Sequence, residues 1–524
     1  MRKKRIGHLV GFIFALWLSI TTALIGTANN PLVDAVKSQN AETVRSLIVE
    51  GANVNETEPD GATALHWSAY RDDLDTTVLL IDAGANVNAP NALGATPLWL
   101  AADNGSSTMT ALLLKAGGDP NVALPWGETP VMTASRTGNL RTVQLLLDAG
   151  ADANASEYAR NQTALMWAVS QGHHAIVKTL LEHGADVSAH SKERPRLMHA
   201  DSTNASQYDQ GIMWNRGGYS PLLFAARQGH IDSAKFLLAA GANVNDKAPT
   251  GASALVVSSH SGHGSFATWL LNEGSNPNLM DAGYSALHAA ILRGDRPLVE
   301  ELLKHGADPN ARLETGTPIR RTSQDWAFNP ALVSATPYWL AAFYREPEIM
   351  RLLVAAGADP RLTTLELWRQ VFERAGGVGP PSITGGFETP LMAAVRGSSD
   401  RNRFFLNRRD ANKGEERKAL ETIKFAASLG NDIDAIDQNG NTVLHTAASR
   451  NYITIVQFLA ERGASLNIKN NAGRTPLDLA VSAEERRALG VNQVDESSAN
   501  TAALLRKLGA TNEPVSEKVE AARR

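Results

Sequence analysis

Apolar residues along most of this chain recur at the spacing of amphipathic helices, in short runs that are broken by polar turns. The first clear pair of runs predicts helices over residues 63–71 and 74–82. A single pair of such short helices cannot bury its own apolar face, whereas stacked neighbours can. The pattern therefore predicts helix pairs that are stable only as a stack.

The pattern repeats about every 33 residues. The pentad Gly-Ala-Asn-Val-Asn begins at Gly51 and again at Gly84. Related pentads begin at Gly117, Gly150, Gly184, Gly241, Gly274, Gly306, Gly357, Gly430 and Gly463, and a degenerate copy begins at Gly509. Most of these glycines lie 21 residues after a Thr or Ser that we call a front: Thr63, Thr96, Thr129, Thr163, Ser220, Ser253, Ser285, Thr336, Thr389, Thr442 and Thr475. Asn30 takes this role in the first copy, so about twelve units are expected.

The front residue, the proline that often follows it and the pentad glycine each have a physical reason. Thr or Ser before a helix accepts a hydrogen bond from an unpaired backbone N–H and so caps the helix. Proline directly after the front, as at Pro97, suits the first helical position. The pentad glycine ends the second helix, because it readily adopts the left-handed conformation found at helix C-termini.

The segments Gly440 to Ala448 (Gly-Asn-Thr-Val-Leu-His-Thr-Ala-Ala) and Gly306 to Asn310 (Gly-Ala-Asp-Pro-Asn) resemble the ankyrin repeat. The resemblance covers about residues 30–510. It implies an all-α solenoid of helix–turn–helix units with protruding finger loops, whose concave side is made by the fingers and first helices. It also implies protein binding without chemistry of its own.

Five insertions interrupt the solenoid, which we place at residues 29–510. They lie near 189–219, 311–335, 361–388, 399–418 and 483–500, and residues 511–524 form a charged tail. The first three fall in finger loops, where insertions often serve binding. The fourth falls between the two helices of its unit, and we expect it to be the weakest joint of the stack.

The N-terminus has the three parts of a secretory signal. Basic residues fill 2–5, an apolar run follows from Leu9 to Ile25, and small residues end it at Ala28. We expect cleavage after Ala28; the alternative is an uncleaved inner-membrane anchor, the only membrane attachment we expect. Either form exports the rest of the chain, to the periplasm as our first choice, or by secretion.

Two groups of residues are candidates for partner binding. The first is a lane of exposed first-helix positions, seven and eight residues after each front, and six of its ten pairs contain Arg. Such a lane favours an acidic partner; alternatively, these arginines are inherited scaffold. The lane includes Tyr70, Arg71, Arg136, Arg227, Arg293, Phe343 and Tyr344, with Arg396 and Arg450.

The second group lies in the finger insertions, where aromatic residues stand in polar surroundings near arginines. Its members are Trp214, Arg320, Arg321, Trp326 and Trp368, with Phe328 beside them. Trp and Arg are typical of interface hot spots. The alternative is that the aromatic rings fold back and hold the loops to the solenoid, which we favour for Trp368.

No residue pattern predicts catalysis, a cofactor or a metal site. The chain has no cysteine, which excludes thiolate chemistry, and its histidine pairs fall in the register of repeat turns. Histidines three residues after a front, such as His288, are expected to bond within and between loops. Other fronts carry Trp, Met, Leu or Val there, which indicates packing variation rather than a ligand pocket.

The net charge is −4, which disfavours a general nucleic-acid binder. These observations predict an exported, non-enzymatic, monomeric scaffold that binds a protein through its concave face and finger insertions. The alternative is a receptor for an acidic polymer or glycan of the cell envelope.

Overall fold

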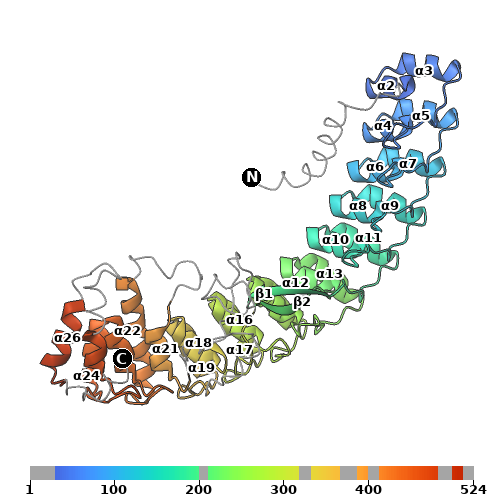
Figure 1. Ribbon diagram of the computed structural model, residues 1–524. Helices are drawn as coiled ribbons and strands as arrows, with labels where there is room; N and C mark the ends of the chain where they lie inside the picture. The colour runs from blue at the N-terminus through green and yellow to red at the C-terminus, as the bar shows by residue number, and fades with distance from the viewer. Residues whose placement is uncertain are drawn as a thin grey trace. The chain divides into compact units, whose positions relative to one another are not determined.

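The computed structural model describes residues 30–199, 211–317, 328, 332–365, 386–398, 412–481 and 498–511. These residues form short helix pairs (Figure 1). The chain divides into two compact units, unit 1 up to Asp186 and unit 2 from Val187. The predicted signal peptide, residues 1–28, lies outside the described residues.

Unit 1 contains five helix pairs among its described residues. They are α2 (Pro31–Lys37) with α3 (Ala41–Val49), α4 (Ala64–Tyr70) with α5 (Leu74–Asp82), α6 (Pro97–Asn104) with α7 (Ser107–Lys115), α8 (Pro130–Thr137) with α9 (Leu140–Asp148), and α10 (Ala164–Gln171) with α11 (His174–Glu182). The pair predicted over residues 63–71 and 74–82 is thus confirmed as α4 and α5.

Unit 2 continues the same pattern. Its pairs are α12 (Pro221–Gln228) with α13 (Ile231–Ala239), α14 (Ala254–Ser261) with α15 (Gly264–Asn272), α16 (Ala286–Arg293) with α17 (Arg296–Lys304), α18 (Pro337–Phe343) with α19 (Pro347–Ala355), α21 (Pro390–Arg396) with α22 (Asn412–Ser428), and α23 (Val443–Arg450) with α24 (Ile453–Glu461). Residues 476–481 are helical, and α26 (Ser498–Lys507) follows.

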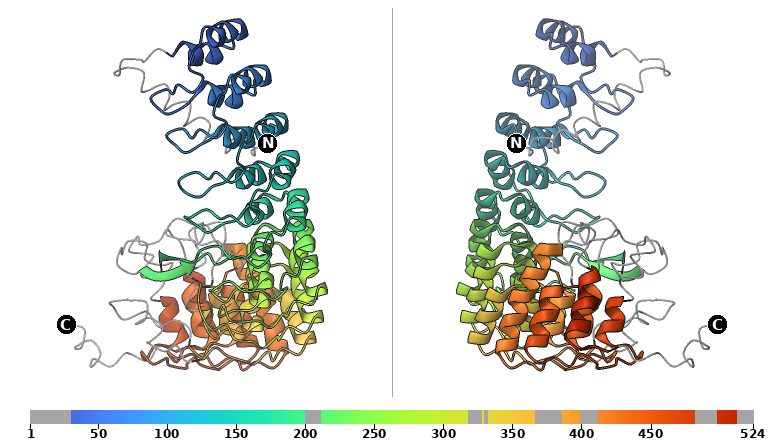
Figure 2. Two further views of the ribbon diagram at one scale, coloured as in Figure 1. Left: turned by 90° about the vertical axis from the view of Figure 1, so that its right-hand side faces the viewer. Right: turned by 90° about the vertical axis from the view of Figure 1, so that its left-hand side faces the viewer.

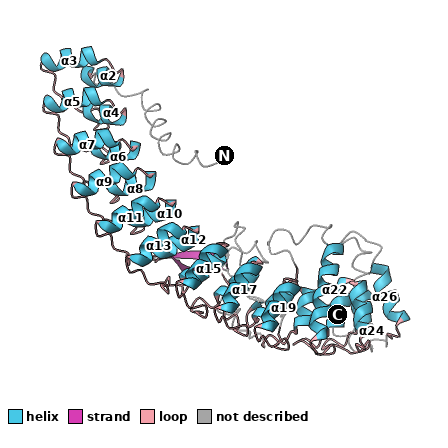
Figure 3. Cartoon of the chain, turned by 180° about the vertical axis from the view of Figure 1, so that it is seen from behind, coloured by secondary structure: helices cyan, strands magenta, loops and turns pink. Residues whose placement is uncertain are grey.

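One feature departs from an all-helical fold. Within the first finger insertion, β1 (Arg194–His199) pairs antiparallel with β2 (Gly211–Arg216). Figure 3 shows this hairpin against the otherwise helical chain. Sequence analysis located the insertion but did not predict its strands.

The fronts cap the first helices as predicted. At Thr63 the side chain accepts a hydrogen bond from the His66 N–H, and most other fronts make the same bond; Thr129 makes no such bond. At the other end, Gly51 has φ +89°, and a Cβ there would meet nothing within 4 Å. The left-handed backbone, rather than crowding, therefore explains why glycine stands at this position.

One asparagine in most repeats ties each loop to the next. Asn88 donates from Nδ2 to the carbonyl of Gly117 (2.9 Å) and accepts at Oδ1 from the N–H of Asp119 (2.8 Å). The same pair of bonds is made by Asn55, Asn121, Asn154, Asn278 and Asn310. We call these five asparagines and Asn88 the asparagine ladder.

The ladder position is not asparagine in every repeat: Ser188, Arg361 and Asp434 also stand there. The residue at the ladder position of the repeat that begins at Gly184 is Ser188, beside the division between Asp186 and Val187. The division of the chain falls just before the first finger insertion, and the expectation that the weakest joint lies at residues 399–418 stays a prediction.

A buried arginine explains why unit 2 holds together around the fourth insertion. Arg345 is 3% exposed and donates to the carbonyls of Ala394 (3.0 Å) and Gly397 (2.6 Å) at the end of α21. It also forms an ion pair with Glu415 of α22. Residues 412–418, which we had assigned to the insertion, belong to α22.

Arg345 occupies a turn position that is glycine in six other repeats, and its φ is +59°. A non-glycine residue in this conformation costs about 1–2 kcal/mol. The hydrogen bonds and the ion pair of its side chain offset that cost. Arg345 thus joins the turn after α18 to both helices of the next unit.

We predict that Arg345→Met lowers the free energy of unfolding of unit 2 by about 3–5 kcal/mol, because the bonds of the buried guanidinium to the carbonyls of Ala394 and Gly397 and its ion pair with the partly buried Glu415 are lost. Urea unfolding of the full chain, followed by tryptophan fluorescence, measures this. The control is Lys304→Met, which removes a fully exposed pair with Glu300 and Glu301 and should leave unfolding unchanged. Equal effects of the two substitutions would contradict the role of Arg345.

Candidate functional site

The ordinary finger loops among the described residues are hairpins, and most are closed by one backbone hydrogen bond, which we call the neck. In ordinary fingers the N–H of Glu58 donates to the carbonyl of Ala62 (2.8 Å), and that of Asn91 to Ala95 (3.0 Å). Figure 2 shows the fingers of unit 1 projecting to one side of its helices. The donor lies seven residues after the pentad glycine, and the acceptor directly precedes the front.

The three long fingers keep the same neck. Ser191 donates to Tyr219 (3.0 Å), Leu313 to Ala335 (2.9 Å) and Thr364 to Glu388 (3.1 Å). These donors and acceptors occupy the same register positions as in ordinary fingers. Each insertion therefore lies between the two neck residues of its finger, where an ordinary finger has only its tip.

Several predicted insertion residues lie outside the described structure. These are Arg320, Arg321, Trp326 and Trp368. Trp214 lies in β2, where its backbone pairs with Arg196. Phe328 is fully buried, and its ring centroid lies 5.2 Å from that of Tyr284, so at this residue the loop is held to the solenoid rather than offered to a partner.

The arginine lane is less positive than we expected. Arg136 contacts Glu128 (3.3 Å) and Asp103 (3.5 Å). Burial raises the pKa of Asp103, and the nearby Arg136 opposes that shift. Arg396 lies 2.8 Å from Glu388, a carboxylate whose pKa is raised by burial.

The remaining lane arginines differ in their surroundings. Arg293 donates to the Ser261 carbonyl (3.2 Å), and Arg450 to the carbonyl of Arg396 (2.5 Å). Arg71 and Arg227 are exposed. Four of the six arginines thus hold the solenoid together, and their roles in binding stay predictions.

The aromatic lane positions also divide. Tyr70 is exposed. Phe343 stacks on Trp339 with ring centroids 5.5 Å apart. The expectation of exposure is wrong at Tyr344, which is 4% exposed and whose ring lies edge-on to that of Phe343, with centroids 5.3 Å apart.

Unit 1 carries a cluster of aromatic side chains that sequence reasoning missed. Trp126 and Tyr158 stand exposed at the tips of two ordinary fingers. Trp126 donates from Nε1 to Glu128 (3.0 Å), and Glu128 in turn contacts Arg136, whose Cζ lies 5.6 Å from the ring centroid of Trp167. The sequence signal for this cluster was the Pro-Trp-Gly turn at residues 125–127, because a tryptophan at the tip of a finger turn lies away from the core and is exposed.

Buried histidines link successive repeats. Nδ1 of His66 accepts from the Thr63 N–H (3.1 Å), which places the proton on Nε2, and Nε2 donates to the Ala95 carbonyl (3.0 Å). His288 and His445 make corresponding bonds, which confirms the expectation that these histidines bond within and between loops. Burial lowers the pKa of all three, to about 4 for His288, so they are neutral.

Trp339 replaces the histidine and keeps its bond to the next repeat. Its Nε1 donates to the carbonyl of Glu388 (3.0 Å), the neck acceptor of the following finger. The substitution is therefore more than the packing variation that we inferred, since an indole can donate where neutral imidazole does.

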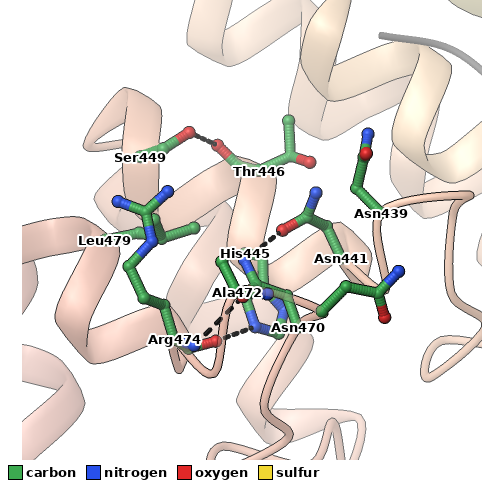
Figure 4. Close-up of a pocket in the computed structure, with 10 residues that line it drawn as sticks. Asn439, Asn441, His445, Thr446, Ser449, Asn470, Ala472, Arg474 and Leu479 are labelled. Carbon is green, nitrogen blue, oxygen red and sulfur yellow. Dashed lines mark hydrogen bonds between the residues drawn. The ribbon is translucent and has the colours of Figure 1, made fainter. Parts of the chain in front are cut away.

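A pocket of about 500 Å³ lies between two ordinary fingers of unit 2 and α23 (Figure 4). Its lining residues are Asn439, Asn441, His445, Thr446, Ser449, Asn470, Asn471, Ala472, Arg474 and Leu479. The fold already uses several of these polar groups: Asn470 donates to Asn441 (2.8 Å), and His445 to the Arg474 carbonyl (3.1 Å). The pocket presents no nucleophile beside a base.

Neither a metal site nor a membrane-spanning helix is found among the residues that the structure describes. No three His, Asp or Glu side chains there come together so as to hold a metal ion. No helix there is both long and apolar enough to cross a membrane.

Comparison with known families matches the chain to ankyrin repeats over residues 32–123, 107–191 and 222–312. Further ankyrin-repeat matches cover residues 165–238 and 427–480. Together these matches span more than half of the chain.

Two characterised proteins match part of this chain. The chain is 26% identical over 277 residues to E3 ubiquitin-protein ligase KEG of Arabidopsis thaliana, covering 51% of this chain and 16% of that protein. It is 30% identical over 232 residues to ankyrin repeat and SOCS box protein 16 of Homo sapiens, covering 44% and 47%. The chain spans less than half the length of these relatives.

We predict that the buried histidines make stability fall in mild acid. The unfolded chain takes up protons near pH 6.5, while folded His288 stays neutral to about pH 4, so stability declines as pH falls through this window. His288→Met removes this contribution because Met does not titrate, and the fold accepts Met at the same position in three other repeats.

Urea unfolding at pH 7 and pH 5 tests the prediction. The loss of stability between these two pH values should be about 2 kcal/mol smaller in His288→Met than in the unchanged chain. Both proteins contain the same carboxylates, so the pH dependence that these groups cause cancels when the two losses of stability are subtracted. Equal losses would show that His288 is not held neutral.

Proposed function

Because this chain belongs to the ankyrin repeat family, we propose that it is a non-enzymatic scaffold that binds a protein partner through its concave face and finger insertions. The observation that carries the proposal is the set of closed necks. A neck that stays hydrogen-bonded fixes both ends of a long loop, which lowers the entropy lost when the loop is ordered by a partner. Three such loops on one stack form an interaction surface that ordinary fingers do not provide.

We propose further that the chain is exported. The support is the basic, apolar and small-residue pattern of residues 1–28. The periplasm is the first choice of location, with secretion or an N-terminal inner-membrane anchor as alternatives. No cofactor is part of the proposal.

Recognition of an acidic polymer or glycan is the second candidate, and the described contacts weigh against it. It requires free positive charge along the concave face, yet Arg136 and Arg396 lie against carboxylates and Arg293 and Arg450 bond backbone carbonyls. The protein-binding function is therefore preferred.

Affinity capture from an envelope extract of the producing cell tests the proposal. The bait is residues 29–524, compared with a variant in which Trp214, Trp326, Arg320 and Arg321 are changed to Ala. We expect a protein that the unchanged bait captures and the variant loses, because aromatic and Arg side chains contribute most to interface affinity.

The matched control changes Arg45, Val49 and Val78, which are exposed on second helices, to Ala. This control should retain the captured protein. Capture of no protein by any bait, with retention of an anionic polymer that high salt releases, would contradict the scaffold and support the polymer receptor.

A further inference from the structure

The two units differ in charge. Residues 30–186 contain 18 Asp and Glu against 8 Lys and Arg, a net charge of −10. Residues 187–524 contain 36 against 38, a net charge of +2. Unit 1 therefore attracts cations, and the whole-chain value of −4 conceals this difference.

An apolar row crosses three consecutive finger tips of unit 1. Leu93, Trp126 and Tyr158 are 48%, 44% and 69% exposed. The Tyr158 N–H donates to the Trp126 carbonyl (2.9 Å), and a Cβ on Gly127 would lie 2.9 Å from the Tyr158 ring. The Tyr158 ring therefore covers Gly127, directly beside Trp126.

Two other tryptophans of unit 1, Trp67 and Trp167, each have a cationic side chain over the ring. Nζ of Lys37 lies 4.5 Å from the ring centroid of Trp67 and pairs with Glu58, which accepts the Trp67 indole N–H (2.6 Å). Arg136 lies over Trp167, whose N–H donates to Gln162 (3.1 Å). Each ring thus carries a cation on its face, and its N–H is held by a finger side chain.

Trp126 has the same indole anchor and lacks the cation. Its N–H is held by Glu128, and among the residues that the structure describes no Lys or Arg lies over the rings of Trp126 or Tyr158. Asp103 also lies near this place, because it contacts the same Arg136 as Glu128 does. Exposed aromatic faces beside carboxylates in an acidic unit are suited to bind a guanidinium group.

We propose that the finger tips of unit 1 bind a basic protein segment, with an arginine side chain stacked on Trp126 and Tyr158. The proposal rests on the scaffold function and names the chemistry of one partner. It replaces, for unit 1, the acidic partner that the arginine lane suggested. Arg136 cannot attract an acidic segment there, since Glu128 and Asp103 already neutralise it.

Fluorescence anisotropy with three labelled peptides tests the proposal on the full chain. The probes share a Gly-Ser background and carry Arg, Gln or Glu at the same four positions. We expect the Arg peptide to bind more tightly than the Gln peptide by roughly tenfold or more, and the Glu peptide not to bind.

Variants locate the site. Trp126→Ala with Tyr158→Ala should weaken the Arg peptide by roughly tenfold, and Trp126→Phe with Tyr158→Phe should restore part of that loss. The matched control is Ile436→Ala, which removes an exposed apolar side chain from a finger of unit 2 and should change nothing. Circular dichroism confirms that each variant is folded.

Equal binding of the Arg and Gln peptides would overturn the proposal. Unchanged Arg-peptide affinity in the Trp126 and Tyr158 double Ala variant would do the same. Either result leaves the scaffold function standing if affinity capture still yields a partner, so the two failures are distinguishable.

Discussion

The side-chain amide of one asparagine, in six of the repeats, is the constraint on which the spacing of the stack depends. An amide offers a donor and an acceptor at fixed separation, and each ladder asparagine uses both on the next loop. Asn88 can reach Gly117 and Asp119 only if successive loops keep one spacing. That requirement accounts for a repeat length that varies little where no insertion is present.

The ladder also explains where the chain tolerates extra residues. It fixes the loop up to the neck, and the neck bond then closes the finger in long and ordinary copies alike. Insertion beyond the neck disturbs neither set of bonds, whereas insertion before it would break the register. Most of the long insertions accordingly extend finger tips, and the one between α21 and α22 is bridged instead by Arg345.

Much of the fold was predictable from sequence because its signals are local. The Thr63 cap and the left-handed Gly51 act within one turn of their own helix, so each can be predicted from a single residue type in the sequence. Long-range contacts carried no such signal. The neutralisation of Arg136 depends on Glu128 and Asp103 from two different repeats, and the ion pair between Arg345 and Glu415 joins residues 70 positions apart in the sequence. The candidate surface was therefore predicted less well than the scaffold that presents it.

We infer above all that the scaffold displays its long loops from closed necks. Hydrogen exchange of the backbone amides of Ser191, Leu313 and Thr364, compared with those of Glu58, Asn91 and Leu124 in ordinary fingers, tests it most directly. Closed necks predict slow exchange at all six amides, because each N–H is hydrogen-bonded across its finger. Fast exchange at the three long fingers, with slow exchange at the ordinary ones, would contradict it.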